Sequence, residues 1–277
     1  MHRRLANWVG VIGLCITFAA GPAAARLKLN SIAIKYVAPT NPAHQPIYEK
    51  LKQVRALEYV QTLLSSFRLP RQLTLVLSGC SGMSNAWYGH DEVNVCYELV
   101  EDFVKGGSDG NLPAGLTRTD VILGPLLDVF LHESGHAVFD LLQIPVLGRE
   151  EDAADQFSAY IILQYDRERA RRLILGSAYQ YKMDVKEPNV AMAVTRFSDE
   201  HGIPAQRFFN TLCMAYGSDA TLFADLVGRY LPKDRADVCA YEYRRARFAF
   251  ETLIGPYVDK GAARRFYKMR HRVNVVQ

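Results

Sequence analysis

The chain has 277 residues, of which 49% are hydrophobic and 22% are charged. This is ordinary globular composition and excludes a disordered chain. The 33 Lys and Arg residues stand against 29 Asp and Glu residues, a balance too even to indicate a nucleic-acid-binding protein.

The first 25 residues are typical of a secretory signal peptide. Arg3 and Arg4 precede an uncharged run that ends in the small residues before Arg26, as in a segment that is cut after Ala25. An uncut membrane anchor is the alternative, because the uncharged run could nearly span a bilayer. The pair Gly21-Pro22 and the alanines after it favour cleavage. We therefore expect an exported protein, periplasmic or secreted, which would contact a membrane only through an uncleaved signal sequence.

Residues 26–277 are expected to form a single domain, containing a sheet up to about residue 143 and helical from about residue 144. Alternating apolar residues predict strands over 31–37 and 73–77, and helical periodicity lies between them over 47–67. Segments 86–88 and 93–96 flank the turn GHDE and predict a hairpin at the edge of a small sheet. A helix is expected to follow over 97–104. The predicted fold class is therefore α+β.

The predicted edge strand is a candidate for binding an extended peptide. Asn85, Ala86 and Trp87 would act through their backbone, as the exposed strands of other peptide-binding sheets do. An edge strand that is merely held in place by Cys96 is the alternative.

Four cysteines remain once Cys15 leaves with the signal peptide. An even number of cysteines in an exported chain indicates disulfides. Three connectivities are possible, and the simplest pairs neighbours along the chain, Cys80 with Cys96 and Cys213 with Cys239. Cysteine ligands for a metal are disfavoured, because the chain contains no Cys-x-x-Cys spacing.

The run LHESGHAVFD, residues 131–140, contains two histidines four positions apart. On a helix, His132 and His136 project from one face and can reach one ion. Glu133 lies close enough to act on a metal-bound water without being a ligand. Apolar residues surround the motif and predict a buried helix. An ordinary core helix, whose histidines bind backbone carbonyls, is the alternative.

The ends of this helix are predicted from capping residues and turns. Thr119-Asp120 could cap its start, or Pro125 could take its first position, and we expect its end near Gln143. Further helices are expected over 150–165 and 167–176. Past Pro188 the chain is mostly helical, with breaks predicted at 202–204, 217–218 and 231–232. The basic residues after Asp259 indicate a solvated terminal helix or tail.

A third metal ligand is expected in the run GREEDAADQFSAY, residues 148–160. A catalytic zinc ion held by two histidines needs one more protein ligand and keeps its fourth position for water. We select Glu151, with Asp155 one turn later as the acceptor for a histidine ring nitrogen. Asp152 or Asp155 as the ligand is the alternative. Glu150 and Asp152 are otherwise interpreted as acidic residues that favour the positive end of a helix dipole.

The pair HESGH and EDAAD resembles the HExxH and ExxAD motifs of gluzincin zinc metallopeptidases. In that group the glutamate of the second motif is the third zinc ligand, which here is Glu151. The runs NAWY, CYELVEDF, DEHGIPAQRFFN, LCMAYGSD and LPKDRADVCAYEY also resemble, in order, an exported bacterial family known as domain of unknown function 4344. Metallopeptidase activity is assigned to that family from its zinc motif. The resemblance implies a zincin-like fold with one zinc ion per chain.

The mechanism expected from these residues is metal-assisted hydrolysis of a peptide bond in a peptide or protein substrate. Zinc lowers the pKa of its water to about 7, and Glu133 takes the water's proton and passes it to the leaving amine. His201 is our selection as a second donor to the tetrahedral intermediate, and Tyr179, Tyr181 and Arg207 are the other candidates. A zinc-stabilised exported binding module without catalysis and a zinc hydrolase acting on a non-peptide amide are the alternatives.

Overall fold

The computed structural model describes residues 32–108, 112–113, 115–183 and 198–269 of the chain. The predicted signal peptide, residues 1–25, lies outside the described residues. Within the described parts, no helix combines the length and the apolar character needed to cross a membrane.

The sheet has four strands in the order β1-β2-β4-β3: β1 (Ile32–Tyr36), β2 (Leu73–Ser78), β3 (Ala86–Gly89) and β4 (Glu92–Cys96). β1, β2 and β4 are parallel, and β3 pairs antiparallel with β4 at the end of the sheet. The predicted strands and the edge hairpin are confirmed. The hairpin turns through His90 and Asp91, both with positive φ, a conformation that short polar residues tolerate.

Apolar residues alternate along the strands and cover one face of the sheet. Leu75 pairs with Val93 and Leu77 with Val95, and all four side chains are fully buried. Since side chains two residues apart point to the same face, this pattern directs one face of the sheet into the core. Helix α4 lies beside β3 and β4. The sheet therefore supports the helix that carries the HESGH motif.

The helical segment predicted over 47–67 is two helices, α1 (Gln45–Gln53) and α2 (Ala56–Leu64). Arg55 separates them, with a φ of 56° in the left-handed region, which an α-helix cannot contain. A short 3₁₀ helix, η1 (Pro42–His44), precedes α1, and α3 (Tyr97–Gly106) follows β4. The predicted start of α3 is confirmed, and the helix extends two residues past the predicted end.

Helix α4 (Arg118–Leu141) carries the HESGH motif and begins at neither predicted position. Thr117 is its N-cap: its hydroxyl accepts from the backbone N–H of Asp120, whose carboxylate accepts from the Thr117 N–H at 2.9 Å. This capping box satisfies two amide groups that the helix would leave unpaired. Pro125 consequently lies inside the helix. The predicted end is close, since Leu141 is the last residue and Gln143 has positive φ.

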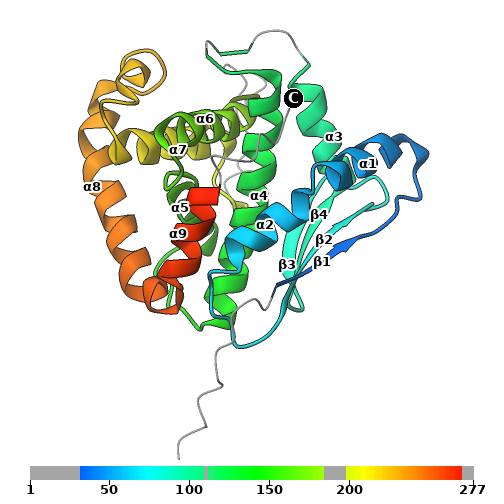
Figure 1. The fold of residues 1–277 in the computed structure, drawn as a ribbon. Helices are drawn as coiled ribbons and strands as arrows, with labels where there is room; N and C mark the ends of the chain where they lie inside the picture. Colours follow the sequence, from blue (N-terminus) through cyan, green and yellow to red (C-terminus); the bar gives the residue numbers. More distant parts are fainter. Residues whose placement is uncertain (1–31, 109–111, 114, 184–197, 270–277) are drawn as a thin grey trace, which may run out of the picture.

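The rest of the described chain is helical, as predicted. The elements are α5 (Glu150–Ile162), α6 (Arg167–Met183), α7 (Pro204–Ser218), η3 (Ala224–Leu226), α8 (Lys233–Ala249), the π-helical turn η4 (Phe250–Ile254), η5 (Gly255–Tyr257) and α9 (Lys260–Met269). Figure 1 shows α4 between the sheet on one side and helices α5 to α9 on the other. The fold is therefore α+β, with α4 at its centre.

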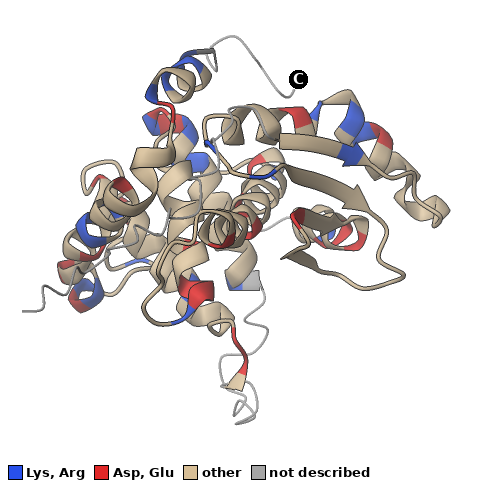
Figure 2. Ribbon diagram, turned by 90° about the horizontal axis from the view of Figure 1, so that it is seen from below, with Lys and Arg blue, Asp and Glu red and all other residues tan. Residues whose placement is uncertain are grey.

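Helices α4 and α6 cross at two glycines. A Cβ on Gly124 would lie 2.5 Å from the carbonyl oxygen of Leu173, and one on Gly176 would lie 2.1 Å from that of Asp120. Only glycine permits this contact between backbones. The crossing holds α6 against the stretch of α4 that precedes the motif. Charged residues of both signs are spread over the outer surfaces of the helices (Figure 2).

Candidate metal centre and active-site cleft

Helices α4 and α5 approach each other closely at the HESGH motif. Gly135 lies between the two histidines, and a Cβ added there would be 3.2 Å from the Phe157 ring and 3.3 Å from the Cα of Ala154. The small residues of α5 that the sequence places on one face therefore permit the close approach. This packing brings the first turn of α5, which contains Glu151, beside the histidines of α4.

The three predicted ligands converge. His132 Nε2 lies 3.0 Å from one Glu151 oxygen, and His136 Nε2 lies 3.4 Å from the other. The two Nε2 atoms are 3.3 Å apart, and one ligand atom from each of the three residues falls within 4.8 Å of the others. Asp152, one of the alternative ligands, is not in this group. Two imidazole nitrogens and a carboxylate are a common donor set for zinc.

The other ring nitrogen of each histidine contacts a carboxylate on α5. His132 Nδ1 is 2.8 Å from Asp155, as predicted for a residue that orients the ring. Arg207 on α7 donates two hydrogen bonds to the same carboxylate, at 2.6 and 2.9 Å. His136 Nδ1 is 2.7 Å from Glu150. Glu150 lies in the first turn of α5, as the helix-dipole interpretation expects, and its side chain also reaches back to α4, a contact that the sequence did not indicate.

The carboxylates make the site favourable for a cation. Burial lowers the pKa of His132, but hydrogen bonds to Asp155 and Glu151 outweigh it and raise the value to about 10. Burial likewise favours neutral Glu151, but the histidines hold the pKa of its carboxyl far below the usual range. A metal ion between these residues would balance the charge of the carboxylates, as protons on the histidines do without a metal. Metal binding and protonation of the histidines therefore compete.

Glu133 lies next to the histidines but outside the converging group. Its side chain is buried, with 9% of the residue exposed. Burial raises the pKa of its carboxyl, opposed by the nearby His132 and His136. A carboxylate whose pKa is raised is a stronger base than an ordinary one, which suits a group that takes a proton from water.

His201 lies just before α7 and also reaches the centre. Its Nε2 is 2.9 Å from Glu151, and its ring stacks on His132 with centroids 6.0 Å apart. Asp199 lies 3.3 Å from its Nδ1. Glu151, Glu200 and His201 form a second group of potential ligands, so His201 is near enough either to donate to a substrate or to bind a metal.

The other candidates for a donor to the tetrahedral intermediate are Tyr179, Tyr181 and Arg207, and each is either bound to another residue or outside the cleft. Tyr181 donates to Asp128 at 2.9 Å and lies under the guanidinium of Arg207, which is bound to Asp155. Tyr179 is buried and is not among the residues that line the cleft beside the centre. His201 contacts Glu151 of the converging group directly, and 41% of its side chain is exposed, against 18% for Arg207.

A cleft of about 570 Å³ opens beside His132 and Glu133. Its walls come from α3, α4 and α6, and from the loop that leads into β3, where Ser84, Asn85 and Ala86 line it. The predicted substrate edge thus borders the cleft at Asn85 and Ala86. Trp87, with 40% of its surface exposed, does not line the cleft. The backbone carbonyl of Asn85 accepts a hydrogen bond from the Cys96 N–H at 3.1 Å, which ties this segment to β4.

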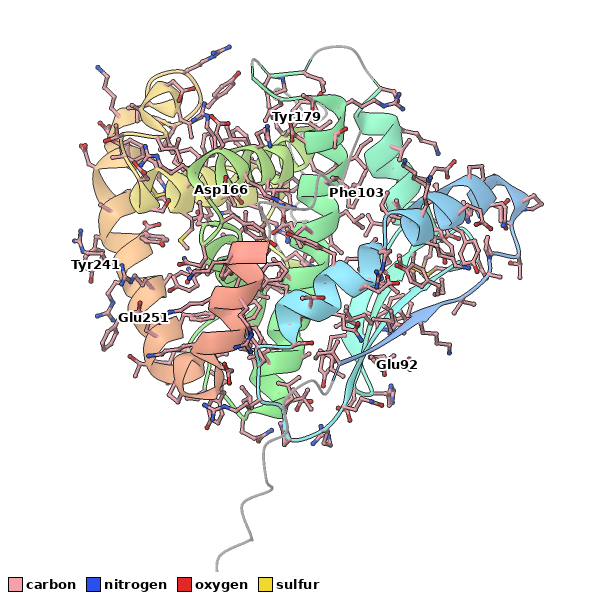
Figure 3. The ribbon with its side chains drawn as sticks, in the orientation of Figure 1. Glu92, Phe103, Asp166, Tyr179, Tyr241 and Glu251 are labelled. Carbon is pink, nitrogen blue, oxygen red and sulfur yellow. A yellow bond between two sulfur atoms is a disulfide. The ribbon has the colours of Figure 1, made fainter. Side chains whose placement is uncertain are left out.

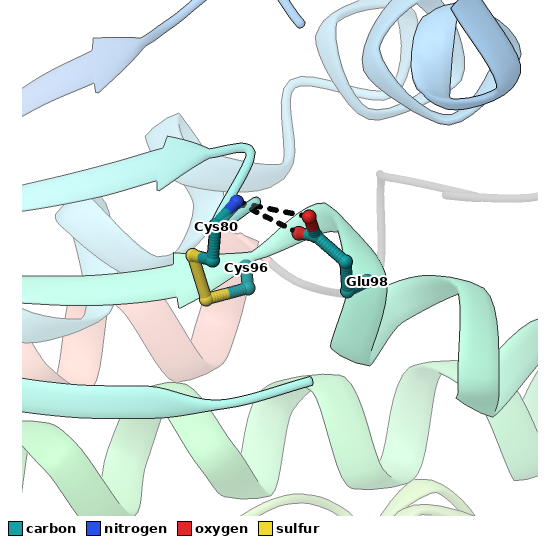
Figure 4. Close-up of side chains that lie close together, drawn as sticks. All are labelled: Cys80, Cys96 and Glu98. Carbon is teal, nitrogen blue, oxygen red and sulfur yellow. Dashed lines mark hydrogen bonds between the residues drawn. A yellow bond between two sulfur atoms is a disulfide. The ribbon is translucent and has the colours of Figure 1, made fainter. Parts of the chain in front are cut away.

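The loop before β3 is held by a disulfide and a buried carboxylate. Cys80 and Cys96 are bonded, and Cys213 is bonded to Cys239 between α7 and α8, which confirms both predicted pairs. The Glu98 carboxylate accepts from the backbone N–H of Cys80, which lies 2.9 and 3.0 Å from its two oxygens (Figure 4). It also accepts from the backbone N–H of Gly82 at 2.9 Å. Because the sulfur atoms are bonded to each other, Cys80, Cys96 and Glu98 are not a metal site.

Sequence reasoning missed the buried polar cluster around Asp128. Asp128 lies one turn before His132 and accepts from Ser158, Ser177 and Tyr181, which come from α5 and α6. Nothing in the local pattern identifies these partners. A polar residue on the buried face of α4, four positions before His132, was the only available signal.

One comparison identifies a family. A model described as "Putative metallopeptidase", for domain of unknown function 4344, matches residues 36–254, well over half of the chain. No curated protein and no solved structure matches the chain.

Proposed function

The chain belongs to the metallopeptidase family whose model spans residues 36–254, and from this premise we propose that it is an exported, zinc-dependent peptidase of the gluzincin type. The observation that carries the proposal is the convergence of His132, His136 and Glu151, from two helices, within 4.8 Å of one another. Two disulfides support export, because such bonds persist in oxidising compartments.

His132, His136 and Glu151 would hold the metal. The donor set suits zinc, and Asp155 and Glu150 fit the role of acceptors that fix the orientation of the two rings. A zinc ion held there would polarise the scissile carbonyl and lower the pKa of a water molecule.

Glu133 is proposed as the general base and then the general acid. It takes one proton from the attacking water as the new C–O bond forms. It then delivers that proton to the amide nitrogen as the C–N bond breaks, so that the carboxylate is regenerated. The raised pKa of its carboxyl supports the first transfer.

His201 is proposed to stabilise the negative charge on the carbonyl oxygen. The hydrogen bond to Glu151 raises the pKa of His201, which favours the cationic ring, a donor at both nitrogens. Asp199 would fix the ring through Nδ1 and leave Nε2 on the side of the centre. Preorganised donors of this kind act where charge develops during the reaction.

Strand β3 is proposed to align the substrate. It ends the sheet, and its N-terminal end borders the cleft beside Glu133. An extended peptide could add to this edge through backbone hydrogen bonds.

The proposal is tested by measuring metal content and peptide cleavage together. Purified wild-type protein, Glu133→Gln and Glu151→Ala are compared by elemental analysis after reconstitution with zinc. We expect about one zinc ion per chain in the first two, loss of zinc in Glu151→Ala, and cleavage by wild type alone. Wild-type protein that fails to retain zinc would contradict the proposal at its first step.

A further inference from the structure

The cleft beside Glu133 is formed by the matching faces of three helices. On α3, Leu99, Asp102, Phe103 and Gly106 line it. They are spaced by three or four residues, so they share one face of that helix. Figure 3 marks Phe103 on α3 beside α4. The side of α3 that carries Asp102 therefore faces the cleft.

The walls near Asp102 are apolar. Leu99 and Phe103 on α3 stand with Pro125 and Val129 of α4 among the lining residues, and Phe103 is almost fully buried. Asp102 itself is exposed. Polar atoms form the larger part of the whole lining. The apolar side chains of Leu99 and Phe103 nevertheless flank the solvated Asp102 carboxylate on α3, which suits a side chain with a long methylene stem and a polar end.

The charges around the cleft leave Asp102 unneutralised. Arg207 is the only Lys or Arg among the described lining residues, and Asp155 binds it with two hydrogen bonds. Lys105, next to Asp102 in sequence, pairs with Glu101 at 3.2 Å. Among the residues that the structure describes, none forms an ion pair or hydrogen bond with Asp102.

The other carboxylates of the cleft have partners or a separate role. Asp128 accepts hydrogen bonds from three hydroxyl groups, and Glu133 stands beside the metal ligands. With a divalent cation bound, the charges of Glu133 and Glu151 would offset it. Arg207 offsets Asp155, and a cationic His201 ring, which also lines the cleft, offsets Asp128. Asp102 then gives the mouth of the cleft a negative potential, which attracts cationic groups.

We propose that the cleft binds a lysine or arginine side chain of the substrate, adjacent to the scissile bond, with Asp102 as its ionic partner. The methylene stem packs between Leu99, Phe103 and Val129, and the cationic end stays at the solvated mouth. This inference rests on the proposed peptidase function and makes it specific: the substrates are peptides with a basic residue at the cleavage site.

The activity test uses pairs of internally quenched peptides that differ only by lysine or norleucine at one position. Norleucine keeps the stem and removes the charge. We expect kcat/KM to be roughly two- to fivefold higher for lysine, as for an exposed ion pair, and the preference to shrink at high salt. The ratio falls to about one in Asp102→Asn, and Asp102→Lys favours glutamate over lysine.

Asp237→Asn is the matched control, since it makes the same charge change at an exposed position of α8 that does not line the cleft. It should keep the wild-type ratio. Equal cleavage of lysine and norleucine peptides by wild-type protein, or an unchanged ratio in Asp102→Asn, would overturn the inference and leave the peptidase function intact.

A binding measurement separates this inference from the proposed function. Zinc-loaded Glu133→Gln is titrated calorimetrically with the same peptides, with and without Asp102→Asn. Tighter binding of the lysine peptide that depends on Asp102 supports the pocket even if wild-type protein cleaves nothing. Equal binding of both peptides rejects the pocket whatever the activity.

Discussion

Individual residues at the centre have separable roles because each contacts a different atom. His132 uses Nε2 toward the predicted metal position and Nδ1 toward Asp155. His201, which lies just before α7, places its Nε2 2.9 Å from Glu151. Substitutions at these positions should therefore affect metal affinity and turnover differently.

Asp155→Asn should weaken zinc binding and, because it also removes the ionic partner of Arg207, lower the stability of the fold. The amide keeps the size of the side chain but removes the charge that orients His132 and strengthens its basicity. Changes of this kind typically cost about 10- to 100-fold in metal affinity, which competition with a chelator measures. Asp152→Asn is the control on the same helix. If both variants hold zinc as tightly as wild type, the proposed role of Asp155 is wrong.

His201→Ala should lower turnover with zinc content unchanged. Loss of one donor to a developing oxyanion costs on the order of 10²- to 10³-fold in kcat. Elemental analysis and peptide hydrolysis are measured on the same preparation. Loss of zinc would instead identify His201 as a ligand, in keeping with its place beside Glu151 and Glu200, and would favour the alternative of a closed, non-catalytic centre.

At the scale of elements, the loop before β3 and the α4–α6 crossing position the cleft. The loop is fixed by Glu98 and by the disulfide between Cys80 and Cys96. The crossing is fixed by Gly124 and Gly176. Both features depend on backbone atoms, so substitutions there should alter stability rather than chemistry.

Glu98→Gln should destabilise the protein at neutral pH by about 1 to 3 kcal/mol, since one amide oxygen cannot replace two carboxylate oxygens. Burial favours the neutral acid, but the backbone N–H groups of Gly82 and Cys80 lower the pKa of Glu98 overall. Because the pKa of Glu98 is lower in the folded state, its ionised carboxylate stabilises the fold at pH values above the unfolded-state pKa, near 4.3. This stabilisation is lost as the pH falls through the folded-state pKa.

The difference between wild type and Glu98→Gln should therefore narrow below about pH 4. Urea unfolding at several pH values measures it. Glu92→Gln, on β4, is the control and should show no such dependence. A constant difference between wild type and Glu98→Gln at all pH values would contradict the assigned role of the carboxylate.

Gly176→Ala should destabilise by about 1 to 3 kcal/mol or more, because the added methyl group would overlap the Asp120 carbonyl and force α6 away from α4. Chemical denaturation gives the change in free energy of unfolding. Gly261→Ala, in α9, contacts only flexible side chains at 3.2 and 3.3 Å and should be neutral or slightly stabilising. Equal effects at the two positions would show that helix propensity, not the crossing, is what matters.

For the whole molecule, the two disulfides join segments separated by 16 and 26 residues. Cross-links of that length stabilise by about 3 kcal/mol in the chain-entropy model. We expect the double variant Cys213→Ala, Cys239→Ala to lose about this much free energy of unfolding. Urea unfolding without reductant measures the loss, and wild-type protein treated with reductant is the reference. An unchanged unfolding midpoint would mean that packing of α7 on α8 alone holds this region.

Local patterns in the sequence determined most secondary-structure elements of this protein and the shared face of its two motif histidines. The two histidines share a face because a helical turn takes 3.6 residues, and the strands follow from alternation, so both could be derived without a partner. The α+β class, the hairpin, the disulfide pairs and most helix starts were also predicted, whereas α6 continues to Met183, seven residues past its predicted end. The start of α4 was not predicted, because Thr117, Thr119 and Pro125 are all acceptable start signals. The single domain over 26–277 and the signal peptide stay predictions.

The tertiary structure decided which distant side chains meet. Glu150 looks like any acidic residue at a helix start, and its contact with His136 exists only because α5 packs on α4 at Gly135. The partners of Asp128 and the bond between Arg207 and Asp155 likewise join separate helices. Asp102 faces the cleft only because α3 lies beside α4. Such contacts depend on the distances and angles between helices, which local periodicity does not contain.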